Sequence, residues 1–309
     1  MVGSAHSSTG MRRQGLGQLQ IIAAAVLFST GGAAIKACSF SSWQIAGFRS
    51  GLAALAVLVV LPSARRGWSR RSAAVGLAYS ATMILFVLAN KLTTSANTIF
   101  LQDTAPLYVL LLGPLLLRES IRLRDGVFMG VVATGLVLFF VGAEPPRETA
   151  TNPLAGNILA AVAGVSWALT IMGMRSLGRK TGGGTGAISA VAIGNLVAFL
   201  VCLPLAWPVP TGTAGDWALV AFLGVFQIGL AYVLMTRGIA HVPALTASIL
   251  LLIEPVINPI WTFFIHGELP GPWSLGGCTL ILVATMINIG WAGRGGRKTS
   301  KRQNVETSK

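Results

Sequence analysis

The sequence has few charged residues, and acidic residues are the scarcest of them. Only 10% of its 309 residues are charged, and Asp and Glu together number 9. Soluble domains carry roughly 25% charged residues, whereas 53% of this chain is hydrophobic and its mean hydropathy is +0.72. This composition excludes a soluble globular protein and indicates an integral membrane protein.

The chain is also poor in the residues that build metal, redox and nucleotide sites. Its three cysteines and three histidines have no spacing typical of a zinc site or a disulfide framework. The glycine-rich segment 181–186 lacks the Lys-Ser/Thr ending of a phosphate-binding loop. We therefore expect no metal and no cofactor. The acidic residues are too scattered for the active site of an intramembrane transferase, so we expect no enzymatic activity.

What the sequence does contain is a series of long apolar runs separated by short polar loops. About 20 apolar residues are needed for one helix to cross the hydrocarbon core. The runs predict an all-α membrane protein with ten transmembrane helices and no room for a soluble domain. The expected spans are residues 17–37, 42–62, 72–90, 97–117, 125–142, 154–175, 185–207, 216–237, 244–266 and 272–292.

The basic residues predict the orientation of these helices. Ten crossings place 19 of the 23 Lys and Arg residues on one side, which the positive-inside rule identifies as the cytoplasm. Both termini are then cytoplasmic in the cell membrane. The net charge of +14 is explained by orientation and attraction to anionic lipid, so we expect no nucleic-acid partner. Lys36 and Lys91 fall on the opposite side, where we expect them to snorkel as anchors at helix ends.

A repeat links the two halves of the chain. Pro106 precedes Glu119 by 13 residues and Pro255 precedes Glu268 by 13, with an offset of 149 residues between the copies. Because five helices is an odd number, the second copy must be inverted relative to the first. Inverted repeats are typical of secondary transporters, which bind solute near the membrane midplane between the halves.

The predicted architecture is therefore two inverted five-helix repeats around a central cavity. Its parts are a basic tail at 1–16, a first repeat at 17–142, an extracytoplasmic linker at 143–153, a second repeat at 154–292 and a basic tail at 293–309.

These residues resemble a known family. The ten spans, the doubled Pro-to-Glu pattern, and FSTGGAAIKA followed by WQIAGFRSG are similar to the EamA branch of the drug/metabolite transporter superfamily. The resemblance covers residues 17–292. It implies a ten-helix inverted-repeat fold that exports amino acids or other small metabolites without an ATPase.

Ionisable residues inside the spans are candidate functional groups, because a charge in the membrane costs at least ~2.5 kcal/mol. Glu254 lies near the middle of the ninth span, beside Pro255. We consider it a proton-coupling or cation-binding carboxylate, the alternative being a structural hydrogen-bonded group. Arg49 and Asp103 lie at equal depth in the second and fourth spans. We expect them to form a buried ion pair, structural or gating, with direct solute contact as the alternative.

Other polar and aromatic residues are candidates for the cavity wall, although ordinary hydrogen bonding between helices is the alternative for each. Three prolines are candidate helix bends. The candidate cavity residues are Ser29, Asn90, Asn97, Thr104, Tyr108, Trp167, Gln227 and Asn258, and the candidate bends are Pro106, Pro255 and Pro259.

The sequence thus favours a secondary transporter that exports a small metabolite by alternating access. A passive channel or a non-transporting receptor is the main alternative, although no repeated pore ring or filter loop is present. The expected partners are a small-molecule substrate and membrane lipid. The oligomeric state is left open, and a monomer is compatible with this mechanism.

Overall fold

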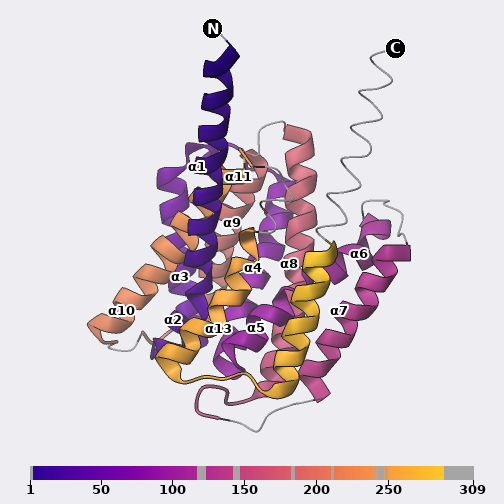
Figure 1. The fold of residues 1–309 in the computed structure, drawn as a ribbon. Coiled ribbons are helices and arrows are strands. Elements are labelled where there is room, and N and C mark those ends of the chain that lie inside the picture. The colour runs from indigo at the N-terminus through magenta and orange to yellow at the C-terminus, as the bar shows by residue number, and fades with distance from the viewer. Residues whose placement is uncertain are drawn as a thin grey trace.

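The computed structural model describes residues 3–116, 123–141, 147–181, 185–209, 212–239, 241–242, 247 and 250–288. Within these residues the secondary structure is helical, apart from one isolated bridge between Arg147 and Ala150. The helices form an elongated bundle (Figure 1). Seven helical segments are long and apolar enough to cross a membrane, and Pro272–Asn288 is a shorter apolar helix. The protein is an all-helical, multi-pass membrane protein.

The first half of the described chain contains seven α-helices. Two of them begin with capping boxes, in which Ser41 and Ser69 accept a hydrogen bond from the backbone of the third helical residue. The helices are α1 (Gly3–Ser29), α2 (Gly31–Ala37), α3 (Ser42–Val60), α4 (Arg70–Leu92), α5 (Ser95–Gln102), α6 (Ala105–Leu116) and α7 (Leu123–Val141). Because α1 begins at Gly3, helix extends through most of the segment expected as an N-terminal tail.

The second half contains a further series of α-helices and one irregular segment. The residues Phe222–Leu230 form a π-helix within the eighth expected span. The elements are α8 (Pro153–Thr181), α9 (Thr185–Cys202), α10 (Ala214–Ala221), the π-helix, α11 (Ala231–Ile239), α13 (Ile253–His266) and the helix Pro272–Asn288. Glu119, the expected tail at 293–309 and residues 143–146 of the expected linker lie outside the described residues.

Three of the expected spans are interrupted within the described residues. The first is interrupted at Thr30, the fourth at residues 103 and 104, and the ninth at Leu252. Pro106 and Pro255 lie in the first turn of the helices that follow the last two breaks, where a missing N–H costs little. The two breaks are separated by 149 residues, the same offset as the two prolines. The repeated sequence pattern therefore coincides with a repeated break in the helices.

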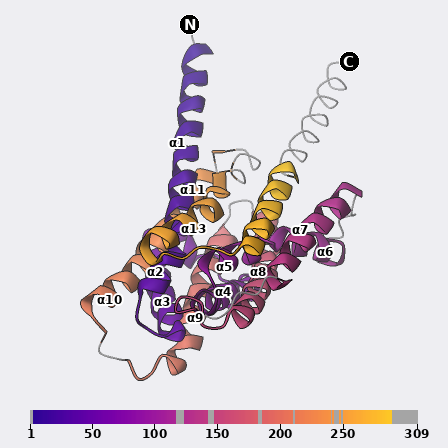
Figure 2. The same ribbon diagram turned by 60° about the horizontal axis from the view of Figure 1, so that its bottom comes forward.

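Packing between the halves holds the bundle together. Helix α4 of the first half lies against α8 and α9 of the second, and α3 lies against α9 and the π-helix. Glycine permits the closest approach, since a Cβ on Gly194 would lie 2.7 Å from the carbonyl oxygen of Gly76. Figure 2 shows the bundle from a second direction, with α1 extending beyond it.

Successive spans run in opposite directions, while the helices within one interrupted span run in the same direction, so the bundle has two ends. We call the end at which α1 begins the terminal end, and the end at which α2 and α13 finish the far end (Figure 1).

Candidate functional site

A cavity of about 390 Å³ lies inside the bundle, bordered by residues from both halves of the chain. This volume is at the small end of the range for ligand pockets, about 300–1,000 Å³. Most of the wall is aromatic or aliphatic, with a few polar groups among them. The polar and charged residues include Arg49, Gln102, Asp103, Gln227, Tyr232, Glu254, Thr285 and Asn288.

The cavity extends from the helix breaks toward the terminal end. Asp103 and Glu254 lie at the breaks of the fourth and ninth spans, and Asn288 is the last described residue of its helix. Met235 lies near the end of α11 at the same side. The cavity therefore occupies the terminal half of the bundle, and a different set of residues fills the far half.

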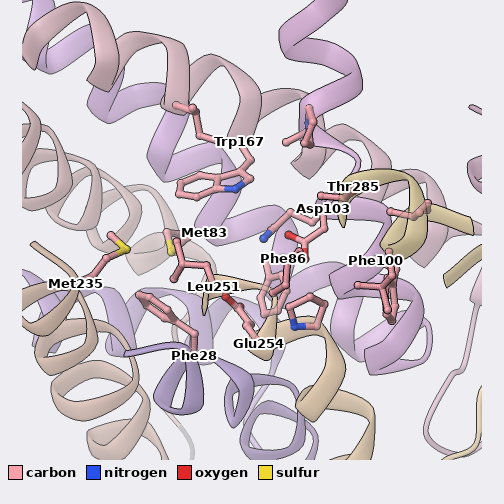
Figure 3. A pocket seen from close by; sticks show the side chains of 18 of the residues that line it. Phe28, Met83, Phe86, Phe100, Asp103, Trp167, Met235, Leu251, Glu254 and Thr285 are labelled. Atoms are coloured by element: carbon pink, nitrogen blue, oxygen red, sulfur yellow. The ribbon is translucent and has the colours of Figure 1, made fainter. Parts of the chain in front are cut away.

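Several residues singled out from the sequence meet at this cavity. They are Arg49, Asp103, Pro106, Trp167, Gln227, Glu254 and Pro255. Figure 3 shows Asp103 and Glu254 directed into the space between Trp167 and Phe28. The helix breaks explain why these carboxylates reach the cavity. Asp103 directly follows the end of α5, and Glu254 lies in the first turn of α13.

The remaining candidates do not border the cavity. Thr104 Oγ1 donates to the carbonyl oxygen of Leu101 in its own turn, 2.6 Å away. Tyr108 packs beside Gly164, and Pro259 lies inside α13. Ser29, Asn90, Asn97 and Asn258 take part in hydrogen bonds between or within the helices.

Arg49 and Asp103 share the cavity but do not form the expected ion pair. The ion pairs of the described residues join Lys36 to Glu268 and Arg124 to Asp125. Arg49 instead donates from Nη2 to the carbonyl oxygen of Met83 at 3.0 Å, and its guanidinium carbon lies 6.0 Å from the centre of the Phe86 ring. Both residues border the same cavity, but the guanidinium of Arg49 is directed to a backbone oxygen.

The two carboxylates that meet at the cavity are Asp103 and Glu254. Both side chains face the same space (Figure 3). Glu254 lies in the first turn of α13, where the helix dipole favours a negative charge. Two carboxylates facing one space repel each other unless a proton or a cation lies between them.

The far end is closed by a buried ion pair that the sequence did not reveal. Lys36 Nζ lies 3.0 Å from Glu268 Oε2, and the two side chains are 4% and 1% exposed. Lys36 also donates to the carbonyl oxygens of Thr93 and Thr149. The expectation that Lys36 snorkels at the surface is therefore wrong, because acidic and carbonyl oxygens from three other segments enclose it.

Hydrogen bonds extend this ion pair across the two broken spans. The backbone N–H of Ser95 donates to Glu268 Oε1 at 2.5 Å, and Ser95 Oγ donates to Asn258 Oδ1 at 2.7 Å. A Cβ on Gly32 would lie 1.7 Å from Ser95 Oγ, so only glycine fits there. We call Lys36, Ser95, Asn258 and Glu268 the far-end cluster. It joins the end of α2, the start of α5 and the end of α13.

A second buried group links α5 to α8. Asn157 Oδ1 accepts hydrogen bonds from Thr93 Oγ1 at 2.7 Å and from Asn97 Nδ2 at 3.2 Å. Its Nδ2 donates to the carbonyl oxygen of Phe139 at 2.9 Å. Asn157 is 1% exposed, so these bonds satisfy polar atoms that have no access to water. Asn97 therefore helps to join helices and does not line the cavity.

Comparison with known proteins agrees with this geometry. The EamA-like transporter family matches residues 15–141 and again residues 154–290. The chain belongs to the EamA-like transporter family. Two matches in one chain suggest repeated halves, and this family consists of transporters that are not enzymes.

Relatives of this EamA chain include exporters. A pseudopaline exporter, CntI of Pseudomonas aeruginosa, is 25% identical over 276 residues, which cover 87% of this chain and 94% of the relative. The threonine/homoserine exporter RhtA of Escherichia coli K12 is 26% identical over 177 residues, 56% of this chain and 58% of the relative. A solved crystal structure with 17% identity matches 90% of this chain and 98% of its own with a TM-score of 0.60, which supports the fold alone.

Proposed function

We propose that this protein is a secondary transporter that exports a small metabolite from the cytoplasm by alternating access. Its two halves would be inverted five-helix repeats with the cavity between them. The observation that carries this proposal is a cavity on the terminal side of two helix breaks, with the far-end cluster closing the opposite side. With cytoplasmic termini, this arrangement is a cytoplasm-facing conformation ready to receive a solute.

The matched breaks supply the moving parts in this proposal. The fourth and ninth spans are interrupted at corresponding positions of the two halves, beside Pro106 and Pro255. Rocking of one half against the other would separate Lys36 from Glu268 and open the far end. The cavity would then close on the terminal side. The exporters among the relatives support the outward direction.

Glu254 is the residue we propose as the link between solute binding and this movement. It borders the cavity at the start of α13, while α13 ends beside Glu268 in the far-end cluster. When Glu254 gains or loses a charge or a bound group, α13 would transmit the change to the ion pair that closes the far end. A proton or a solute cation at Glu254 would serve as the signal.

The test compares the medium of cells that express the wild type, Glu254→Gln or Glu148→Gln at matched protein levels. Glu148 is exposed and lies outside the cavity, so its substitution controls for the loss of a carboxylate. We expect a metabolite to accumulate outside cells that express the wild type or Glu148→Gln, and not outside those with Glu254→Gln. Accumulation above the cytoplasmic concentration separates a transporter from a passive channel. If the medium has the same metabolite concentrations for all cells, including cells without the protein, the result would contradict export.

A further inference from the structure

The cavity has an excess of acidic groups that no basic residue of the described part of the chain neutralises. Asp103 and Glu254 both border it, and neither takes part in the ion pairs or side-chain hydrogen bonds of the described residues. Both side chains are directed into the same space (Figure 3). An arrangement of this kind is stable only when a positive charge or a proton enters it.

Arg49 does not supply that positive charge. It is the basic residue of the described cavity wall, but it is 1% exposed and its Nη2 is bound to the carbonyl oxygen of Met83. Its guanidinium lies against the Phe86 ring and makes no ion pair within the described residues. The cavity wall thus has two carboxylates and one guanidinium that is bound elsewhere, so the cavity favours a cation.

An independent observation points to a ligand with hydrogen-bond donors. Gln227 borders the cavity and is 6% exposed, and its Oε1 has no hydrogen-bond partner among the described residues. Its Nε2 is already bound to the carbonyl oxygen of Phe28 at 3.3 Å, which fixes the amide so that Oε1 remains an acceptor. The residue is carried by the π-helix, a rare geometry that is frequent at functional sites. A buried acceptor without a donor costs about 1–3 kcal/mol, which a bound N–H group would recover.

The rest of the wall suits an apolar body. Phe28, Met83, Phe86 and Trp167 lie on the same cavity as the two carboxylates (Figure 3). Aromatic faces attract cations as well as apolar groups, most strongly where water is excluded. The wall therefore combines an acidic centre with surfaces that accept rings and aliphatic chains.

We infer that this cavity binds a solute with a protonated amine attached to an apolar body. The amine lies between the carboxylates of Asp103 and Glu254, with Gln227 Oε1 as a further acceptor, and the apolar body packs against Trp167 and Phe28. The inference rests on the proposed function, because it names the class of solute that the transporter would carry. The solute is then recognised both by the charge of its amine and by the contacts of its apolar body.

The test uses the full-length protein in nanodiscs of zwitterionic phosphatidylcholine, so that lipid charge does not attract the probe. Binding is measured by calorimetry at neutral pH for three molecules of nearly the same shape: phenethylamine, phenethyl alcohol and 3-phenylpropionate. We expect the amine to bind at least tenfold more tightly than the alcohol, and the carboxylate to bind more weakly than both. This comparison uses the wild type alone and does not depend on the folding of a variant.

Substitutions then assign the preference to the two acids. Asp103→Asn and Glu254→Gln should each reduce amine affinity at least tenfold and leave the weak binding of the alcohol unchanged, while Glu148→Gln should change neither. Equal affinity for amine and alcohol, a preference for the carboxylate, or an amine preference that survives both substitutions would overturn the inference. Those results would leave export intact if the medium still differs between wild type and cells without the protein. Loss of that difference would be a failure of the proposed function itself.

Discussion

Breaking the Lys36–Glu268 ion pair should open the far end of the bundle. Both side chains are almost fully buried and their charged atoms are 3.0 Å apart. Removing one partner leaves the other charge buried and unpaired, which typically costs about 3–5 kcal/mol. If the pair exists only while the far end is closed, this energy is lost from the closed conformation alone. A closed conformation favoured 99 to 1 becomes equally populated with the open one after a loss of about 2.7 kcal/mol.

Lys36→Met and Glu268→Gln are the substitutions that test this. The reporter is a single cysteine at Ala33, which is 2% exposed and whose carbonyl oxygen is 2.9 Å from His266 Nε2. The native Cys38, Cys202 and Cys278 are all free and buried, so they are first replaced. A membrane-impermeant thiol reagent is applied from the far side. We expect slow labelling in the parent and at least tenfold faster labelling in either single variant.

The double variant and a neighbouring lysine supply the controls. The double variant leaves no unpaired charge, so its labelling rate should fall back toward the parent. Lys91→Met removes a lysine that donates to the carbonyl oxygen of Cys38 without an acidic partner among the described ion pairs, and should have the smaller effect. Unchanged labelling in the single variants, or a double variant whose effect is the sum of the two, would refute the reasoning.

Three further predictions concern packing and orientation. Gly32→Ala should lower the thermal midpoint and accelerate labelling at the far end, because its Cβ would overlap Ser95 Oγ, whereas Gly15→Ala, which has open space, should change neither. Asn157→Leu should destabilise the protein by about 1–3 kcal/mol, measured by thermal unfolding in detergent, since it removes buried hydrogen bonds to Thr93, Asn97 and Phe139. A cysteine at the exposed Glu148 should react with an impermeant reagent outside intact cells and one at the exposed Arg66 only after lysis, and the reverse pattern would overturn the proposed orientation.

Residue patterns along the chain were sufficient for the parts of the fold that depend on hydropathy and local geometry. The apolar runs predicted a multi-pass helical protein, because each span must bury its own backbone polar groups in lipid. Pro106 and Pro255 marked the two positions near which the structure breaks its helices. Glu254 was a candidate because a carboxyl within an apolar run is costly unless it has a use. The resemblance to the EamA branch was confirmed by the family match over both halves.

The hydrogen-bond and ion-pair partners of the buried polar side chains could not be predicted in the same way. Counting residues placed Arg49 and Asp103 at equal depth, and both border the cavity, yet Arg49 bonds to Met83. Asn97 and Asn258 were grouped with the cavity residues, but they bond to Asn157 and Ser95 instead. Hydropathy gives the depth of a residue, and helical spacing gives its position relative to neighbours on the same helix. Neither gives the rotation of one helix against another, which decides what each side chain meets.

The sequence by itself therefore determined the membrane class, the helical content, the repeated proline pattern and the family, because lipid imposes these constraints on each segment separately. Only the tertiary structure brought Lys36 to Glu268, 232 residues away, and Asp103 to Glu254 across the cavity. Such pairs depend on how α2, α5 and α13 pack, and this packing needs glycines such as Gly32, where a Cβ would overlap Ser95 Oγ. The physical reason is that the free energy of placing a segment in lipid depends on the residues of that segment alone. The pairing of charges depends instead on how helices far apart in the sequence pack together.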